Sequence, residues 1–339
     1  MVVTGMMMVL VLVITPDFHQ RLSTGFYSRH YDPTYSQFVM QSLDNPGVFL
    51  AEVSEDVEEE EEEVVAEEGR SPVKREAIGN YNNYSVPAPS NIEYVRVLLD
   101  YGRPQHQPWG GQGSGCGGLR VGFARRLSLP RTALASFPGS GNTWLRYLLQ
   151  GATGLFTGSV YIDRELAAKG FYGENEVPEC GCTIVVKTNG YCLSGLPPDS
   201  GKRLRDVAKF QGRGVLLLRN PYDTLIAYRN YLSAGHLGVA PPAAFRGPDW
   251  AKFVRTQMEV WQGYAEDWIT KSKSVLVVHY EHLLQDPRRE LIRLLRFLRL
   301  KLEHRRLHCV LANLNGVFRR ATPHNTVTDS RELYFFMSQ

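Results

Sequence analysis

Short apolar runs alternate with stretches of helical periodicity after Pro130, and this alternation restricts the fold more than any other feature of the sequence. The apolar runs predict strands at 132–137, 183–187, 214–220 and 274–280, and the stretches after them predict helices at 143–150, 222–231, 250–271 and 287–300. In GVLLLRN the first five residues, Gly214 to Leu218, are apolar without interruption, which is typical of a strand buried on both faces. The pattern predicts an α/β fold in which helices cover both faces of a parallel sheet.

The part of the chain before this region has a different composition. Residues 1–100 contain 6 Lys and Arg against 17 Asp and Glu, whereas the rest of the chain has a net charge of +14. The block EDVEEEEEEVVAEE at 55–68 repels itself and offers little apolar surface to bury. We therefore expect a low-complexity, acidic, disordered stem at 16–130, a folded domain at 131–325 and a C-terminal tail at 326–339. Whether the tail lacks a last helix stays open.

The first fifteen residues, MVVTGMMMVLVLVIT, form an apolar run that Pro16 ends. As a helix this run would extend roughly 22 Å, less than the roughly 30 Å hydrocarbon core of a bilayer. No Lys or Arg precedes it, as a signal peptide or signal anchor would usually require. We interpret residues 1–15 as a short signal anchor, and an incidental apolar terminus is the alternative.

The cysteines do not have the spacing of a metal site. Three of the five lie close together in the sequence, but Cys-x-Cys lacks the usual two-to-four-residue spacing of zinc ligands; the five are Cys116, Cys180, Cys182, Cys192 and Cys309. We predict no metal site. A disulfide near the functional site, formed in a secretory compartment, stays open.

The stretch ASFPGSGNTWLR, Ala135 to Arg146, lies between a predicted strand and a predicted helix. The N-terminus of a helix presents unpaired N–H groups and the positive end of the helix dipole, so a glycine-rich turn placed there can hold an anion. Glycines allow close approach of the backbone and the other side chains add donors; the residues are Gly139, Ser140, Gly141, Asn142 and Thr143. The alternative is a plain tight turn capped by Asn142 or Thr143.

A nucleoside triphosphate is not the anion that this loop favours. In the pattern G-x-x-x-x-G-K-[ST], Ser136 stands at the first glycine and Asn142 at the lysine. The buried strand GVLLLRN ends in Arg219 rather than in a carboxylate that could bind Mg²⁺. An arginine at this edge favours a metal-free anion held by bidentate hydrogen bonds.

Four separated segments resemble the sulfotransferases that use 3′-phosphoadenylyl sulfate (PAPS). SFPGSGNTW resembles the family's 5′-phosphosulfate loop, LLLRNPYDTLIAYRNY its 3′-phosphate segment, VVHYEHLLQDPRRELIRLLRFL its later strand and helix, and NGVFRRA its terminal basic segment. They span about 131–323 in the family's order. The resemblance implies the P-loop-like sulfotransferase fold and the following PAPS-binding residues: Pro138, Gly139, Ser140, Gly141, Asn142, Thr143, Trp144, Arg219, Phe318, Arg319 and Arg320.

Within that family, LASFPGSGNTWLR, GFYGE, AGHLG and FRR are most similar to the WSC-domain-containing (WSCD) sialate O-sulfotransferases. A WSC domain needs several disulfides in its own segment, and one cysteine precedes residue 180, so we expect that domain to be absent. The resemblance implies transfer from PAPS to a carbohydrate hydroxyl on sialylated glycans, in the Golgi lumen, from a single-pass membrane anchor and without a nucleic-acid partner.

Three positions depart from the family pattern. Gly139 stands where the loop commonly has lysine, Ala227 where a serine often binds the 3′-phosphate, and Asn189 where cytosolic members have a histidine base. We expect Lys187, at the end of the predicted strand TIVVK, to supply the missing positive charge.

The acceptor hydroxyl needs a base, and asparagine cannot act as one. Carbohydrate-modifying members use a glutamate after the loop helix, so Asp163 and Glu165 are candidates, with His236 as a third. The residues leave the choice open. The alternative function is a catalytically inactive nucleotide- or glycan-binding relative.

Overall fold

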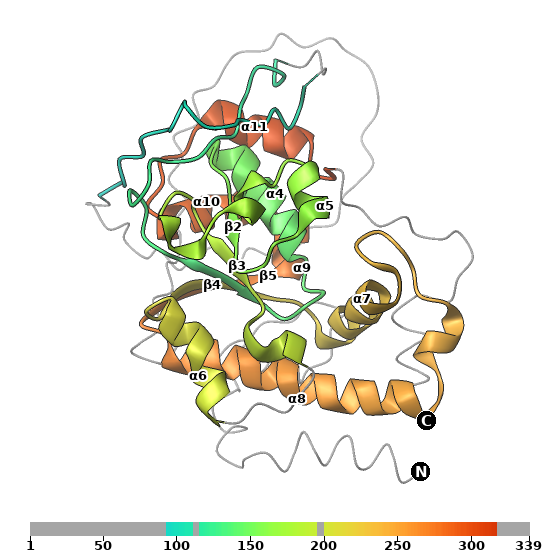
Figure 1. The fold of residues 1–339 in the computed structure, drawn as a ribbon. Coiled ribbons are helices and arrows are strands. Elements are labelled where there is room, and N and C mark those ends of the chain that lie inside the picture. Colours follow the sequence, from blue (N-terminus) through green and yellow to red (C-terminus); the bar gives the residue numbers. More distant parts are fainter. Residues whose placement is uncertain (1–92, 111–114, 195–199, 317–339) are drawn as a thin grey trace, which may run out of the picture.

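The computed structural model describes residues 93–110, 115–194 and 200–316, and at its centre is a sheet of five parallel strands (Figure 1). The strand order is β2-β3-β1-β4-β5. The strands are β1 (Ala133–Ser136), β2 (Gly158–Ser159), β3 (Val186–Thr188), β4 (Arg213–Leu218) and β5 (Ser274–His279). The predicted α/β class with a parallel sheet is confirmed.

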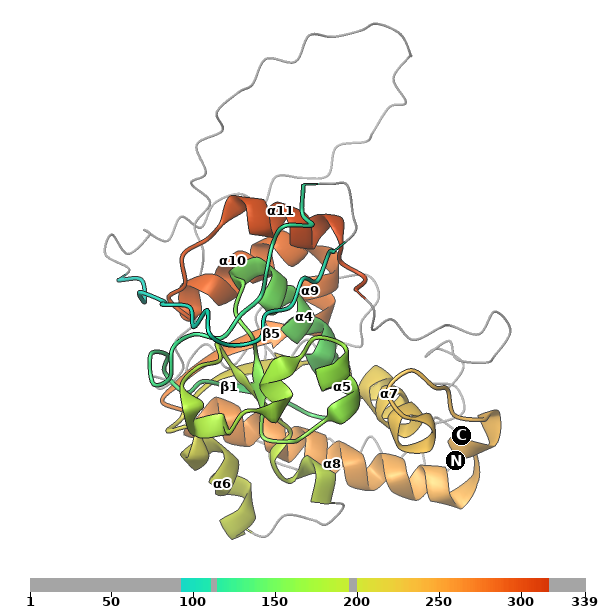
Figure 2. The same cartoon turned by 45° about the horizontal axis from the view of Figure 1, so that its top comes forward.

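Helices cover both faces of this sheet. On one face lie α4 (Asn142–Thr153), α10 (Pro287–Phe297) and α11 (His304–Ala312), and on the other lie α6 (Ser200–Lys209) and the long α8 (Gly247–Lys271), as Figure 2 shows. Next to α8 is α7 (Pro221–Ala234), and two shorter helices are α5 (Arg164–Ala168) and α9 (Tyr280–Gln285). Single 3₁₀ turns occupy Tyr172–Asn175, Pro178–Cys180, Gly190–Ser194 and Pro242–Phe245.

The strand sequences follow from this burial on both faces. Alternate residues of one strand enter different apolar clusters: Leu134 packs with Val215 and Leu276, whereas Ala133 and Ala135 pack on the opposite face. A strand covered by helices on both sides has no polar face, which explains the continuous apolar run of β4.

The predicted elements match the observed ones with small differences in their bounds. The second predicted strand, 183–187, is displaced to β3 (Val186–Thr188); just before it, Ile184 N–H donates to Phe156 O at 3.1 Å and Val185 O accepts from Gly158 N–H at 2.7 Å. Four helices and the two-residue strand β2 were not predicted; these are α5, α6, α9 and α11. The four helices have between five and ten residues, so each offers few turns from which a period can be recognised.

The stem predicted at 16–130 is wrong over its last part. Residues of the described ranges 93–110 and 115–130 are buried against the domain, among them Trp109, Val121, Phe123 and Leu129. The backbone of this segment also pairs with the domain: the N–H of Val95 donates to Arg299 O at 2.8 Å. Glycine and proline content had suggested a linker, but the apolar residues between them enter the core.

A disulfide fixes this segment to the opposite end of the chain. Cys116 is bonded to Cys309 of α11, across 193 residues of sequence. A cross-link that closes a loop of this length removes much conformational freedom from the unfolded chain.

The two terminal regions lie outside the described residues. They include the apolar run at 1–15, the acidic block at 55–68 and the tail at 326–339, all of which remain predictions. Within the described ranges, none of the helices combines the length and apolar character that crossing a membrane requires.

Candidate functional site

The glycine-rich loop connects β1 to α4 at the carboxyl edge of the sheet. Gly139 and Gly141 adopt φ angles of 90° and 93°, a region that only glycine enters without strain. Gly141 is the N-cap of α4, and no side chain caps the helix. The first N–H groups of the twelve-residue helix therefore have neither an intrahelical partner nor a side-chain cap.

One side chain of the loop is buried without a partner. Ser140 is fully buried, and its Oγ makes no hydrogen bond. An orphaned buried hydroxyl costs about 1–3 kcal/mol unless a ligand satisfies it. The loop can therefore donate hydrogen bonds to a ligand that carries acceptor oxygens.

Helix α7 explains the absence of lysine at position 139. A Cβ added to Gly139 would lie 2.5 Å from the carbonyl oxygen of Thr224 and 3.0 Å from the backbone nitrogen of Tyr228. The loop packs so closely on α7 that no side chain fits there. The positive charge must come from another element.

Arg219 supplies one such charge beside the loop. It follows β4, and its Nη1 donates to Gly139 O at 2.9 Å. Its guanidinium lies 4.5 Å from the ring centroid of Tyr280, while its Nε is buried without a partner. Two contacts fix the guanidinium and leave part of its donor capacity unused.

Aromatic rings surround this arginine and the loop. Tyr280 covers Gly141, where an added Cβ would lie 2.6 Å from the ring. Trp144 packs edge-on against Tyr280 at 5.5 Å, and its Nε1 donates to Leu314 O at 2.7 Å. The predicted loop residue Trp144 is therefore held rigidly at the rim of the site.

Lys187 lies in β3, next to β1 in the sheet. Burial lowers the pKa of Lys187 to about 8, and the Arg146 guanidinium acts in the same direction, whereas Glu174 and Asp163 oppose it. Its ammonium group lies 5.7 Å from the ring centroid of Tyr161. A lysine of this kind is charged over most of the neutral range and poorly solvated, so an anion beside it would be bound strongly.

Two of the three predicted base candidates meet in the structure. His236 Nε2 lies 2.7 Å from Oδ2 of Asp163, and both side chains are 19% exposed. Asp163 also caps α5, because its Oδ1 accepts from the N–H of Leu166 at 3.0 Å. Burial raises the pKa of Asp163, but the Leu166 amide, His236 and Lys187 together hold it below its ordinary value.

Glu165 does not join this pair. Its carboxylate is 52% exposed and forms an ion pair with Lys169 at 2.5 Å. Asn189, which stands at the family's histidine position, is buried and donates from Nδ2 to Ser136 O at 2.6 Å. It fastens the end of β1 to the turn after β3.

A fully buried ion pair was not predicted. Arg146 of α4 pairs with Glu174, and Arg146 Nε donates to Thr157 Oγ1 at 2.8 Å. Glu174 Oε2 accepts from the N–H of Asp163 at 3.3 Å, which ties the pair to the site. The motif GFYGE, which ends at Glu174, was the signal that could have indicated this role.

The predicted residues Phe318, Arg319 and Arg320 lie outside the described residues. Pro138, Asn142 and Thr143 lie in the loop or in the first turn of α4 as predicted, and Asn142 Nδ2 donates to Ser136 Oγ at 2.9 Å. That bond stabilises the loop from within.

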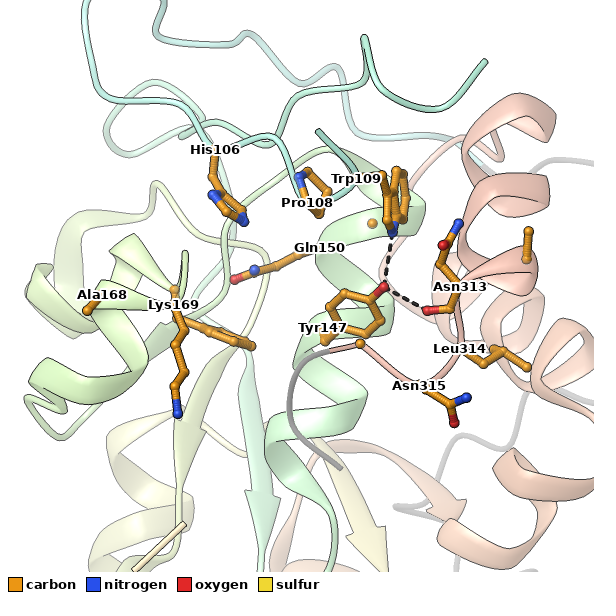
Figure 3. A pocket seen from close by; sticks show the side chains of 14 residues that line it. His106, Pro108, Trp109, Tyr147, Gln150, Ala168, Lys169, Asn313, Leu314 and Asn315 are labelled. Carbon is orange, nitrogen blue, oxygen red and sulfur yellow. Dashed lines mark hydrogen bonds between the residues drawn. The ribbon is translucent and has the colours of Figure 1, made fainter. Parts of the chain in front are cut away.

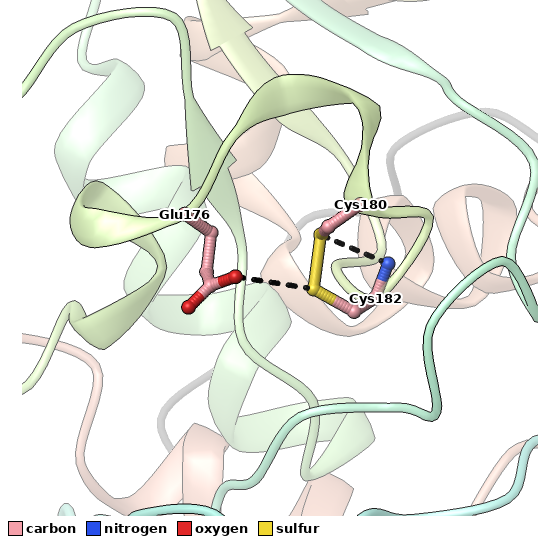
Figure 4. Close-up of side chains that lie close together, drawn as sticks. All are labelled: Glu176, Cys180 and Cys182. Carbon is pink, nitrogen blue, oxygen red and sulfur yellow. Dashed lines mark hydrogen bonds between the residues drawn. A yellow bond between two sulfur atoms is a disulfide. The ribbon is translucent and has the colours of Figure 1, made fainter.

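A group of possible metal ligands lies elsewhere in the described part of the chain. Glu176, Cys180 and Cys182 place their ligand atoms within 4.8 Å of one another. However, Cys180 and Cys182 are joined in a disulfide, so their sulfurs are not available as thiolates (Figure 4).

Comparison with known proteins agrees with this geometry. The family model described as "Sulfotransferase domain" matches residues 207–332. These residues, less than half of the chain, are similar to that domain. The chain is also 39% identical over 194 residues to WSCD family member GA21586 of Drosophila pseudoobscura pseudoobscura, a match that covers 56% of this chain and 57% of the relative.

Two further relatives have the same family name. WSCD family member CG9164 of Drosophila melanogaster is 38% identical over 199 residues, which is 57% of this chain and 58% of the relative. WSCD family member AAEL009094 of Aedes aegypti is 36% identical over 193 residues, 56% of each chain. These matches span less than two thirds of the length of the relatives.

A solved structure, mouse sulfotransferase SULT7A1 complexed with PAP, is also similar to this chain. The match covers 61% of this chain and 80% of the other, with 16% identity and a TM-score of 0.38.

The described residues fit the co-substrate that the resemblance implies. PAPS carries anionic groups at both its 5′ and 3′ ends. The unpartnered Ser140 Oγ and Arg219 Nε are donors buried at the loop, and the uncapped start of α4 adds backbone N–H groups. All of these groups can donate hydrogen bonds, which suits a phosphosulfate or phosphate and needs no cation to bridge them.

Proposed function

We propose that this sulfotransferase domain transfers a sulfuryl group from PAPS to a carbohydrate hydroxyl on a sialylated glycan. The observation that carries the proposal is the buried, unpartnered Ser140 Oγ in a loop at the uncapped start of α4. Arg219 lies beside it with an unused buried donor. Sites of this chemistry favour an anion with several acceptor oxygens.

The residues divide the binding work by position. The N–H groups from Gly139 to Trp144 and the Ser140 hydroxyl would hold the 5′-phosphosulfate. Arg219 would hold the 3′-phosphate together with Arg319 and Arg320, which lie outside the described residues. Trp144 and Tyr280, fixed edge to face, would flank the nucleotide.

The co-substrate supplies an activated sulfuryl group with a phosphate as its leaving group. The acceptor oxygen forms the new O–S bond while the S–O bond to that phosphate breaks. Lys187 neutralises the negative charge that develops on the transferred group. No step requires a metal.

The proton of the acceptor hydroxyl goes to His236. Its Nε2 lies 2.7 Å from the Asp163 carboxylate. Because a carboxylate with a low pKa accepts rather than donates, this contact assigns the proton to Nε2 and makes Nδ1 the basic nitrogen. Asp163 then stabilises the imidazolium that forms, as a carboxylate does in hydrolytic triads.

We place this activity in the Golgi lumen, with residues 1–15 as the anchor. Support comes from the cysteines: four of the five form the disulfides Cys116–Cys309 and Cys180–Cys182. Such bonds persist in oxidising compartments and are rare in the cytosol.

The test is transfer of labelled sulfate from PAPS to sialylated and neutral glycans, with a chelator present. We expect the wild type to label sialylated glycans, and Lys187→Met to lower kcat by about 10²-fold or more. Lys252→Met, which removes an exposed lysine on α8, is the matched control and should leave the rate unchanged. Binding of PAP without labelling of any glycan would instead support the inactive, binding-only relative.

A further inference from the structure

A cavity lies beside the second half of α4, on the side away from the sheet's carboxyl edge (Figure 3). It has a volume of about 580 Å³, is partly open to solvent, and is lined by His106 to Trp109, α4, the end of α5 and residues 312–316. Figure 3 shows Trp109, Tyr147 and Asn313 on one side and His106 and Lys169 on the other, with Gln150 between them.

The walls of this cavity are preformed. Trp109 Nε1 donates to the Tyr147 hydroxyl at 3.0 Å, and that hydroxyl donates to Asn313 O at 2.7 Å. Gln150 Oε1 accepts from the hydroxyl of Thr157 at 2.9 Å, which fixes the amide. These bonds connect three separate segments, so the cavity needs little ordering to bind a ligand.

The charges at the cavity disfavour an anionic ligand. Burial lowers the pKa of His106, so its imidazole is neutral at pH 7. Lys169, the one lysine or arginine among the described lining residues, pairs with Glu165 at 2.5 Å. No uncompensated cation therefore faces the cavity from the residues described, and a phosphate would lack a counter-charge.

Aromatic faces and amides remain as the binding groups. Trp109, Tyr147 and Phe171 provide aromatic surface, and Gln150 and Asn313 bring amide groups to the wall. A few polar groups in an aromatic wall orient a neutral ligand that has both apolar and hydrogen-bonding surface. An uncharged pyranose has this character, because its C–H face is apolar and its rim carries hydroxyls.

The cavity is one short helix away from the Asp163–His236 pair. Asp163 caps the start of α5, and Ala168 and Lys169 at its end line the cavity. Five residues of helix extend about 8 Å. A single oligosaccharide could therefore reach both places.

We propose that this cavity binds an uncharged sugar residue of the acceptor glycan, internal to the residue that receives the sulfuryl group. The inference rests on the proposed sulfotransferase activity and adds the requirement that the acceptor extend beyond one sugar. The cavity favours longer acceptor glycans, whereas the residues around Lys187 take part in the transfer of the sulfuryl group.

The test compares a methyl sialoside with a sialylated lactosamine tetrasaccharide as acceptors. Ala168→Trp and Ala312→Trp fill the cavity from two exposed positions on different helices, so neither removes core packing. Ala251→Trp, also exposed but on α8 across the sheet, is the matched control. Thermal unfolding of each variant checks that the fold is retained.

We expect the wild type and Ala251→Trp to show a KM about tenfold lower for the tetrasaccharide than for the methyl sialoside. Both cavity variants should lose this difference while kcat for the methyl sialoside stays unchanged. A length preference that survives in Ala168→Trp and Ala312→Trp would overturn the proposal, as would a wild type without any preference.

Binding of the tetrasaccharide without PAPS separates this inference from the proposed function. If no acceptor is labelled but the wild type binds the tetrasaccharide and the cavity variants do not, the transfer proposal fails and the sugar site stands. If the wild type neither labels nor binds the tetrasaccharide, both are overturned.

Discussion

His236 Nε2 lies 2.7 Å from Oδ2 of Asp163, although 73 residues separate them in the sequence. The contact joins the segment after α7 to the start of α5. It brings together an imidazole and a carboxylate within reach of Lys187, whose charge contributes to the low pKa of Asp163. In the proposed reaction, this pair takes up the proton of the acceptor hydroxyl.

Removing His236 should lower the rate of sulfuryl transfer strongly but leave the affinity for the nucleotide nearly unchanged. We expect His236→Ala to lower kcat by about 10²- to 10⁴-fold, because general-base catalysis contributes that much. Asp163→Asn should also lower kcat, since an amide no longer fixes the Nε2–H tautomer. Kinetics with saturating PAPS test both variants. Glu165→Gln is the control, and a loss of activity equal to that of His236→Ala would assign the base to Glu165 instead.

Restoring a side chain at position 139 should damage the loop rather than improve it. In Gly139→Ala the new Cβ would approach Thr224 O to 2.5 Å at a φ of 90°. We expect a loss of roughly 2 kcal/mol or more in the free energy of unfolding, together with weaker binding of PAP. Chemical denaturation and calorimetry measure the two effects.

Gly247→Ala separates strain from crowding in that experiment. Gly247 has a φ of 77°, and no atom lies within 4 Å of an added Cβ. Gly247→Ala should therefore lose less free energy of unfolding than Gly139→Ala, because only the positive φ angle is unfavourable for alanine there. If Gly139→Ala and Gly247→Ala lose the same free energy of unfolding relative to the wild type, then the close packing of α7 on the loop does not exclude a side chain at position 139.

Arg219→Lys should weaken PAP binding even though the charge is kept. A lysine cannot reproduce both the bond to Gly139 O and the stacking on Tyr280, and it cannot bind a phosphate through two parallel N–H groups. We expect an affinity lower by about tenfold or more. Arg229→Lys on α7 is the comparison, and an unchanged affinity in Arg219→Lys would remove this arginine from the nucleotide site.

The buried, charged side chain of Lys187 should lower the free energy of unfolding at neutral pH. This destabilisation should disappear in alkaline solution, where the side chain is neutral. Its pKa is about 8 in the folded protein against 10.5 for the ordinary side chain. The unfolded chain therefore binds more protons between these values, and the contribution of Lys187 to stability rises as pH increases from about 8 to about 10.5.

Lys187→Met tests this sign directly. Below pH 8 the variant should be more stable than the wild type by up to about 3 kcal/mol, while it loses the transfer activity. The difference in the free energy of unfolding should close as the pH approaches 10.5. A variant less stable than the wild type at pH 7 would show that the folded protein stabilises the charged form.

Removing the Cys116–Cys309 disulfide should destabilise the whole domain. The bond closes a loop of 193 residues, so its removal by Cys116→Ala and Cys309→Ala should cost about 3–5 kcal/mol in the free energy of unfolding. Cys192→Ala removes a buried sulfur that is not cross-linked and serves as the control. An equal loss in both variants would mean that packing, and not the cross-link, carries the effect.

The sequence by itself determined the features that local patterns record. Alternating apolar runs and helical periods indicated the parallel sheet, because burial on both faces leaves no polar residues in strands such as β4. The glycines of the loop at 139–141 indicated the candidate anion site, because a turn with positive φ angles at a helix start requires glycine at particular adjacent positions. Arg219 was identified because it directly follows an apolar strand in the sequence, which is also a local pattern.

Only the tertiary structure decided the contacts between distant segments. The approach of α7 fixed glycine at position 139, the meeting of two loops joined Asp163 to His236 rather than to Glu165, and burial beside Arg146 set the pKa of Lys187. The segment at 93–130 read as a linker because its glycines and prolines are local, whereas its packing partner, α11, lies nearly two hundred residues away. Which side chains lie close enough to interact depends on the three-dimensional packing of distant segments. A short stretch of sequence does not contain that information.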